Sequence, residues 1–172
     1  MKFPSVLFAL YLFHFVARVP EAASAPMEVF FSPMGGATEA VVRALKQARQ
    51  TVLVQAYSFT SAPIARALVD AHQRGVEVHV ILDKSQRTKK YSSASFLADE
   101  GVPVAIDDAH AVAHNKVMVI DATKVITGSF NFTTAAEKSN AENLLVIDDP
   151  ALAEKYTVNW KNHERHAVAY HR

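Results

Sequence analysis

The chain has 172 residues and half of them are hydrophobic, so it can bury one substantial core as a soluble globular domain. Its 18 basic and 17 acidic residues nearly balance, and overall charge therefore gives no argument for nucleic-acid binding. The chain has no cysteine, which excludes disulfides, a thiolate nucleophile and cysteine-based metal sites.

Residues 1–25 have the pattern of a secretory signal peptide. Lys2 supplies a positive start, an apolar run follows, and small residues precede the expected cleavage near Ser24 or Ala25. We therefore expect a periplasmic or secreted protein with a single domain over residues 26–172. The alternatives are an uncleaved membrane anchor, in which case the membrane would be a partner, and a buried strand or helix.

Strands and helices alternate through the first half of the chain. Such an alternation predicts a parallel sheet with right-handed helical crossovers. The second half differs, because two of its strands are separated only by residues 121–123 and can form a hairpin. We therefore expect an α/β fold with a mixed, mostly parallel β-sheet flanked by helices. The predicted strands are 27–31, 51–56, 76–82, 102–106, 116–120, 124–127 and 142–147, and the predicted helices begin at 38, 64, 94 and 150.

Candidate catalytic side chains occur at fixed spacing in residues 113–131. His114 and Lys116 are two residues apart, so on an extended strand both side chains point to the same face. An imidazole can act as a nucleophile or carry a proton near neutral pH, and an adjacent ammonium stabilises charge on phosphate oxygens. The pair is therefore typical of phosphoryl transfer.

A short loop with neutral hydrogen-bond donors follows the second strand of the predicted hairpin. Ser129 and Asn131 can share one side of this loop and bind the remaining phosphate oxygens, while Gly128 lets the backbone approach a ligand closely. Phe130 and Phe132 flank Asn131, and we expect them to pack and hold the loop rather than to stack on bases.

Two carboxylates are further candidates. Asp121 belongs to the spacing pattern, but it lies at the hairpin turn, where aspartate is common for local hydrogen-bonding reasons, and we favour a structural role over direct catalysis. Glu142 begins the strand after the loop. It is the better candidate for the carboxylate that orients His114, because a nucleophilic imidazole needs its other nitrogen held.

The pattern formed by His114, Lys116, Asp121 and the Gly-Ser-x-Asn loop resembles the HKD signature of the phospholipase D superfamily. Residues 57–59, 128–133 and 140–143 look like segments of the small bacterial single-motif endonucleases of that superfamily. The resemblance extends from about residue 27 to residue 160. It implies the phospholipase D/nuclease-type sandwich fold.

The resemblance implies a mechanism that uses no metal and no cofactor. His114 would attack a phosphodiester and form a phosphohistidine, Lys116, Ser129 and Asn131 would hold phosphate oxygens, and Glu142 would orient His114. A second histidine must protonate the leaving group, and the chain contains only one such motif. We therefore expect a homodimer in which His114 of a second subunit supplies it.

A basic loop is the candidate substrate-binding segment. Arg87, Lys89 and Lys90 cluster there and can contact phosphates; the alternative is a loop that is merely soluble.

Three further histidines have open assignments. His163 and His166 have the spacing of a metal-binding pair, but we favour a solvated helix end. His110 is close in sequence to His114 and could approach the cleft.

Three functions are consistent with these residues. The first is a sequence-nonspecific endonuclease that acts on DNA, with RNA left open as a further substrate. The second is a phospholipase D or cardiolipin-type hydrolase that uses the same residues on a lipid phosphodiester. The third, a nucleic-acid-binding module without activity, is difficult to reconcile with an intact motif.

Overall fold

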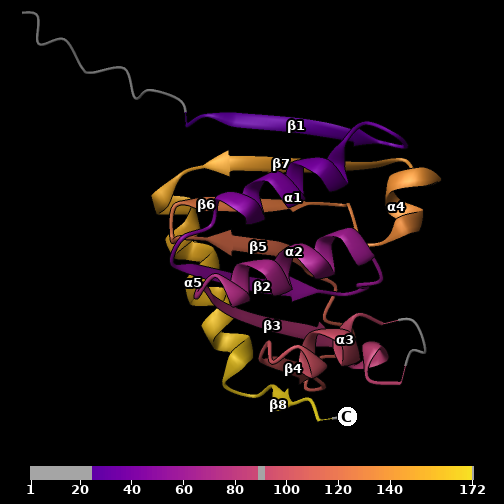
Figure 1. The fold of residues 1–172 in the computed structure, drawn as a ribbon, viewed down its shortest axis with the longest axis vertical. Coiled ribbons are helices and arrows are strands. Elements are labelled where there is room, and N and C mark those ends of the chain that lie inside the picture. Colours follow the sequence, from indigo (N-terminus) through magenta and orange to yellow (C-terminus); the bar gives the residue numbers. More distant parts are fainter. Residues whose placement is uncertain (1–24, 89–91, 172) are drawn as a thin grey trace, which may run out of the picture.

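A single mixed sheet runs through the computed structural model, which describes residues 25–88 and 92–171. Residues 1–24 of the expected signal peptide, together with Lys89 and Lys90, lie outside the described residues. The strand order is β1-β7-β6-β5-β2-β3-β4-β8 (Figure 1). The strands are β1 (Met27–Ser32), β2 (Thr51–Ala56), β3 (Glu77–Asp83), β4 (Val104–Asp107), β5 (Lys116–Ile120), β6 (Lys124–Gly128), β7 (Glu142–Asp148) and β8 (Val168–Ala169).

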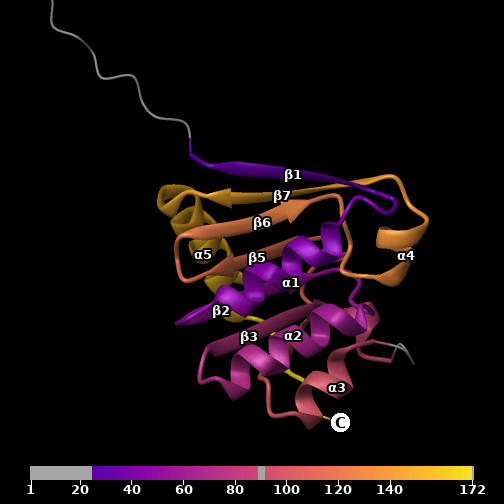
Figure 2. The same cartoon turned by 45° about the horizontal axis from the view of Figure 1, so that its top comes forward.

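Helices cover both faces of the sheet. Two of the helices, α1 and α2, lie side by side on one face, and α5 crosses the opposite face (Figures 1 and 2). The larger core lies under α1 and α2, and a smaller apolar cluster that includes Val119 and Ala153 lies under α5. No described helix has the length and apolar character needed to cross a membrane. The helices are α1 (Ala37–Gln47), α2 (Ala62–Gln73), α3 (Ala94–Asp99), α4 (Thr134–Lys138) and α5 (Pro150–Glu164), with a short 3₁₀ turn η1 (Lys84–Gln86).

The prediction of an α/β fold with a mixed β-sheet flanked by helices is confirmed, but the prediction that the sheet is mostly parallel is wrong. Among the described strands only the β2–β3 and β3–β4 pairs are parallel. No helix separates β4 from β5, and the chain turns back there, so β5 pairs with β2 in the antiparallel direction. The strands β6 and β7 continue this antiparallel meander, and β1 joins β7 rather than β2.

The strand directions bring the ends of several strands to one edge of the sheet. The strands β2, β3, β4 and β6 end at this edge, and β5 and β7 begin there. In Figure 1 it is the edge beside α4. We call it the catalytic edge, because both segments of the predicted catalytic motif, 114–116 and 128–131, meet there. The short elements α4 and β8 were not expected from the sequence.

The turn between β5 and β6 lies at the opposite edge and is built around Asp121. Its carboxylate accepts hydrogen bonds from the backbone N–H groups of Arg49, Gln50 and Thr51 at 2.8–3.2 Å. Asp121 and Ala122 both have φ of 52°, a left-handed conformation that aspartate tolerates. These bonds tie the turn to the start of β2, which is the structural role favoured from the sequence.

Replacement of Asp121 should therefore lower stability. We expect Asp121→Asn, which still tolerates a positive φ, to lower the free energy of unfolding by about 2 kcal/mol because the charged acceptor of three N–H groups is lost. Urea denaturation followed by circular dichroism measures this change.

Asp148→Asn is the matched control, because Asp148 forms an exposed ion pair with Lys124 of the same hairpin. We expect it to cost less than about 1 kcal/mol. Equal losses in the two variants would contradict the structural role of Asp121.

Candidate active site

The register of three strands assembles the motif. Lys116 of β5 lies opposite Ala56 of β2, and Gly128 of β6 lies opposite Leu144 of β7. The β5–β6 register, continued by two residues, places Gly128 opposite Lys116. The His-x-Lys segment, the loop after β6 and the first residue of β7, Glu142, therefore meet at the catalytic edge.

Lys116 is held in a buried position. The residue is 7% exposed, and its Nζ donates a hydrogen bond of 2.8 Å to the backbone oxygen of His114. The same Nζ lies 5.1 Å from the centre of the Tyr57 ring, within the range of a cation–π contact. Burial lowers the pKa of Lys116, and the charge of Glu142 partly offsets this effect. The ammonium group is thus desolvated and fixed before any substrate arrives.

His114 is exposed at the same edge. Its ring lies 4.5 Å from that of Tyr57, at an interplanar angle of 53°. Within the described part of the chain no hydrogen bond fixes either of its ring nitrogens, so both are available to a substrate or to a second subunit. Sequence reasoning gave Tyr57 no role; the signal that could have identified it is its place directly after the buried strand β2.

The loop after β6 is anchored by backbone contacts to Asn143. The N–H groups of Ser129 and Phe130 donate to the Asn143 oxygen at 3.1 and 3.2 Å, and the Asn143 N–H donates to Ser129 Oγ at 3.0 Å. A Cβ on Gly128, whose φ is 145°, would lie only 2.2 Å from the same Asn143 oxygen. Glycine is therefore required here for a close approach between strands.

Asn131 lies in the same loop, and one polar atom of its side-chain amide has no hydrogen-bond partner among the described residues. This atom, Oδ1, is buried. Phe130 and Phe132 on either side are 1% and 0% exposed, and Phe132 packs against Phe59 with ring centres 6.0 Å apart. The expectation that these two rings hold the loop by packing is confirmed.

Glu142 lies where the sequence placed it, at the start of β7, and its charge acts on Lys116. Its Oε1 accepts a hydrogen bond of 3.1 Å from Asn140 Nδ2. No hydrogen bond joins Glu142 to His114 between the described residues of one subunit, so its orienting role stays a prediction.

Two other candidates lie apart from this group. Asp121 is separated from the His-x-Lys segment by the length of β5, about 16 Å at 3.3 Å per residue. Arg87 pairs with Asp108 at 3.2 Å, with its side chain 44% exposed. This pairing leaves Arg87 partly neutralised, and the structure does not describe Lys89 and Lys90.

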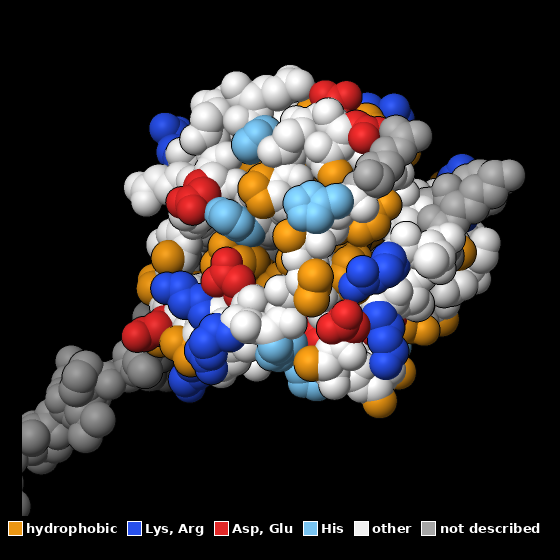
Figure 3. All heavy atoms as spheres, turned by 90° about the horizontal axis from the view of Figure 1, so that it is seen from below, with side chains coloured by type: hydrophobic (Ala, Val, Ile, Leu, Met, Phe, Trp, Pro, Cys, Tyr) orange, Lys and Arg blue, Asp and Glu red, His pale blue; other side chains and the backbone are white. Residues whose placement is uncertain are grey.

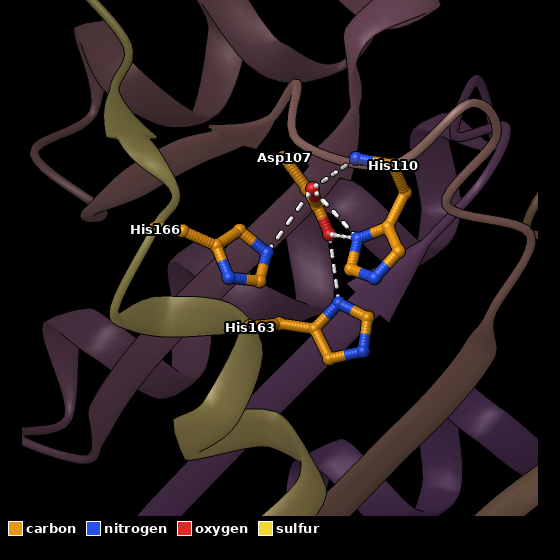
Figure 4. Close-up of side chains that lie close together, drawn as sticks. All are labelled: Asp107, His110, His163 and His166. Carbon is orange, nitrogen blue, oxygen red and sulfur yellow. Dashed lines mark hydrogen bonds and ion pairs between the residues drawn. The ribbon is translucent and has the colours of Figure 1, made fainter.

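The remaining histidines form a cluster that sequence reasoning missed. His110, His163 and His166 all contact Asp107, the last residue of β4 (Figure 4). Burial acts to raise the pKa of Asp107, but the hydrogen bonds from the three histidines outweigh it and hold the pKa at about 2. The interpretation of His163 and His166 as a solvated helix end is wrong for His163, whose side chain is 14% exposed and contacts a buried carboxylate; His166 is exposed but contacts the same carboxylate. Only the tertiary structure joins β4 to the end of α5.

Known proteins of similar sequence and structure are phospholipase D-like. A family model described as cardiolipin synthase, PLD-like domain, matches residues 41–163. Phospholipase D from Rickettsia typhi is 43% identical over 142 residues, which are 83% of this chain and 70% of that protein. Mitochondrial cardiolipin hydrolase from Xenopus laevis is 34% identical over 139 residues, covering 79% of this chain and 66% of that protein. The crystal structure of Nuc, a phospholipase D family member from Salmonella typhimurium, matches with a TM-score of 0.83 at 36% identity and covers 87% of this chain and 100% of that chain.

The opposing effects on Lys116 predict the direction of a pKa change. Because burial lowers the Lys116 pKa below 10.5 and Glu142 raises it, Glu142→Gln should lower it further. A pH titration of lysine ¹³Cε signals by NMR, with the Lys116 signal assigned from Lys116→Arg, measures the shift. Glu154→Gln, an exposed change on α5, is the control and should leave the signal unmoved. A higher Lys116 pKa in Glu142→Gln would contradict the arrangement.

Proposed function

The chain belongs to the phospholipase D superfamily of phosphodiesterases through its PLD-like domain, and from this premise we propose that it is a metal-independent, sequence-nonspecific endonuclease of DNA. RNA is included as a possible second substrate. The observation that carries the proposal is the meeting of exposed His114 with Lys116, Ser129 and Asn131 at one open sheet edge. A long polymer can reach such an edge without entering a deep pocket.

In the proposed reaction His114 attacks the phosphorus, a P–N bond forms and the bond to the leaving oxygen breaks. A second imidazolium gives its proton to that oxygen, and water then attacks the phosphohistidine, passes a proton to the same imidazole and frees His114. The desolvated Lys116 ammonium, with Ser129 and Asn131, would stabilise the phosphate oxygens. The buried position of Lys116 supports this role, because charge stabilisation is stronger away from water.

The second imidazolium is proposed to be His114 of another subunit, in a two-fold homodimer whose axis passes the catalytic edge. Exposed apolar side chains next to this edge support the proposal. Phe31 and Met34 are 67% and 76% exposed, and Ser32, between them, lies opposite Glu142 in the β1–β7 pair. A second copy docked on the catalytic edge would cover these side chains.

Export to the periplasm or the medium is part of the proposal and depends on the pattern of residues 1–25. Determination of the N-terminal residue of the protein purified from the native cell tests it; a chain that begins at Met1 would contradict cleavage.

Hydrolysis of a lipid phosphodiester is the second candidate. It is favoured by the names of two relatives, phospholipase D and mitochondrial cardiolipin hydrolase. The nuclease is preferred because the resemblance of residues 57–59 and 128–133 is to small single-motif endonucleases, and because His114 and Ser129 are exposed at the catalytic edge.

A side-by-side assay with EDTA present separates these functions. We expect plasmid DNA to be cut and cardiolipin-containing vesicles to stay intact, and we expect His114→Ala to lower DNA cleavage by about 10³-fold or more while DNA binding remains. Gel electrophoresis and released phosphatidic acid are the readouts. His72→Ala, in the last turn of α2, is the control. Vesicle hydrolysis without DNA cleavage would favour the lipid enzyme, and cleavage by neither would leave the binding module.

The shared site is tested by mixing subunits. When wild type and His114→Ala are co-refolded in equal amounts, activity per total protein should fall to about one quarter of the wild-type value, because only dimers with two intact histidines cut. Independent active sites would give about one half. Sedimentation of the same samples checks that dimers form.

A further inference from the structure

We propose that Asp107, His110, His163 and His166 form a zinc-binding site that joins the end of α5 to the end of β4. The four side chains converge on a common centre from two segments that are far apart in the sequence (Figure 4). This site is separate from the motif residues and has no part in the reaction proposed above.

Three imidazole nitrogens point at one carboxylate. The Nδ1 of His163 lies 2.7 Å from Asp107 Oδ2, the Nδ1 of His110 lies 2.9 Å from the same oxygen, and the Nε2 of His166 lies 3.3 Å from Oδ1. The Asp107 side chain is fully buried. One hydrogen bond to Asp107 would be enough to attach the end of α5 to the sheet. Three imidazoles around one carboxylate exceed that requirement.

The spacing suits a tetrahedral metal ion. All four ligand atoms lie within 4.8 Å of one another, whereas bonds of about 2.1 Å to a tetrahedral zinc ion place ligand atoms about 3.4 Å apart. On binding, side-chain rotations would move the His163 and His110 nitrogens away from Asp107 Oδ2, from which they now lie 2.7 and 2.9 Å, and bring the more distant ligand atoms together. A neutral imidazole can present either ring nitrogen to the ion, because its proton can move to the other nitrogen.

The sequence positions have the arrangement of a structural zinc site. Asp107 and His110 are three residues apart at the end of β4, and His163 and His166 are three residues apart at the end of α5. Two closely spaced pairs on two elements are typical of structural zinc. Four protein ligands leave no open position for water, so we assign this ion a structural role.

The surroundings complement a divalent cation. Asp83, which is 3% exposed, lies opposite Asp107 in the β3–β4 pair and supplies a second buried carboxylate. Gln55, 2% exposed, lines the same small cavity as Asp107 and His163, and its amide atoms have no hydrogen-bond partner in the described structure. That amide can hydrogen-bond the outer nitrogen of a ligand histidine.

A metal ion can reach the site from solvent. The side chains of His110 and His166 are 47% and 35% exposed, whereas that of His163 is 14% exposed. Figure 3, which views the molecule from below, shows histidine side chains at the surface of this face. The site therefore combines one buried carboxylate, that of Asp107, with two imidazoles that solvent can reach, those of His110 and His166.

Zinc binding by the purified chain tests the proposal. After EDTA treatment and dialysis, isothermal titration with ZnCl₂ should show one ion per subunit. The same protein with Co²⁺ should give the strong visible absorption of a tetrahedral site. Zinc at a hundredfold excess over Kd should raise Tm by about 5–10 °C.

The single variants His110→Asn and His166→Asn should still fold, because both positions are exposed. Each should weaken zinc binding by about 100-fold or more and remove the tetrahedral Co²⁺ spectrum. His171→Asn, an exposed histidine outside the cluster, is the matched control and should bind zinc as wild type does. No zinc binding by the wild type, a six-coordinate Co²⁺ spectrum, or unchanged affinity in both cluster variants would overturn the proposal.

Discussion

The position of β5 between β2 and β6 is the constraint on which the active site depends. Its antiparallel register sets Lys116 opposite Ala56 on one side and opposite Gly128 on the other. A shift by one residue would turn His114 and Lys116 to the other face of the sheet. The register is held by the buried side chains of β5, of which Val117 to Ile120 alternate between the two cores. Packing of the interior therefore determines the geometry of the phosphate site.

Rigid supports surround the groups that are proposed to react. Asn143 anchors the loop that carries Ser129, and buried aromatic rings flank Asn131. Desolvation of Lys116 acts against its charge, and the carboxylate of Glu142 compensates in part. Such a balance keeps a cation ready to meet a phosphate, because water does not have to be removed from it when substrate binds. His114, in contrast, is exposed, as its proposed sharing with a second subunit requires.

The catalytic edge has a different character on its two faces. Side chains alternate along each strand, so Lys116 shares the face of Met118 under α1 and α2, whereas Asp107 points to the face of α5. The phosphodiesterase motif, on β5 to β7, and the histidine cluster, on β4, thus lie at the same edge of the sheet without sharing a side chain. The first has exposed side chains, His114 and Ser129 among them; the second joins two elements of the scaffold.

The amino-acid sequence by itself determined the motif, the strands that carry it and the structural place of Asp121, because these depend on short-range spacing and turn chemistry. It did not determine the strand order or the balance of parallel and antiparallel pairs, since these depend on contacts between distant segments. It could not reveal that His163 and His166 contact Asp107. His163, for example, is 56 residues away from Asp107 along the chain. Only the packing of α5 on the sheet brings them together. Tyr57 became part of the site in the same way, through the pairing of β2 with β5.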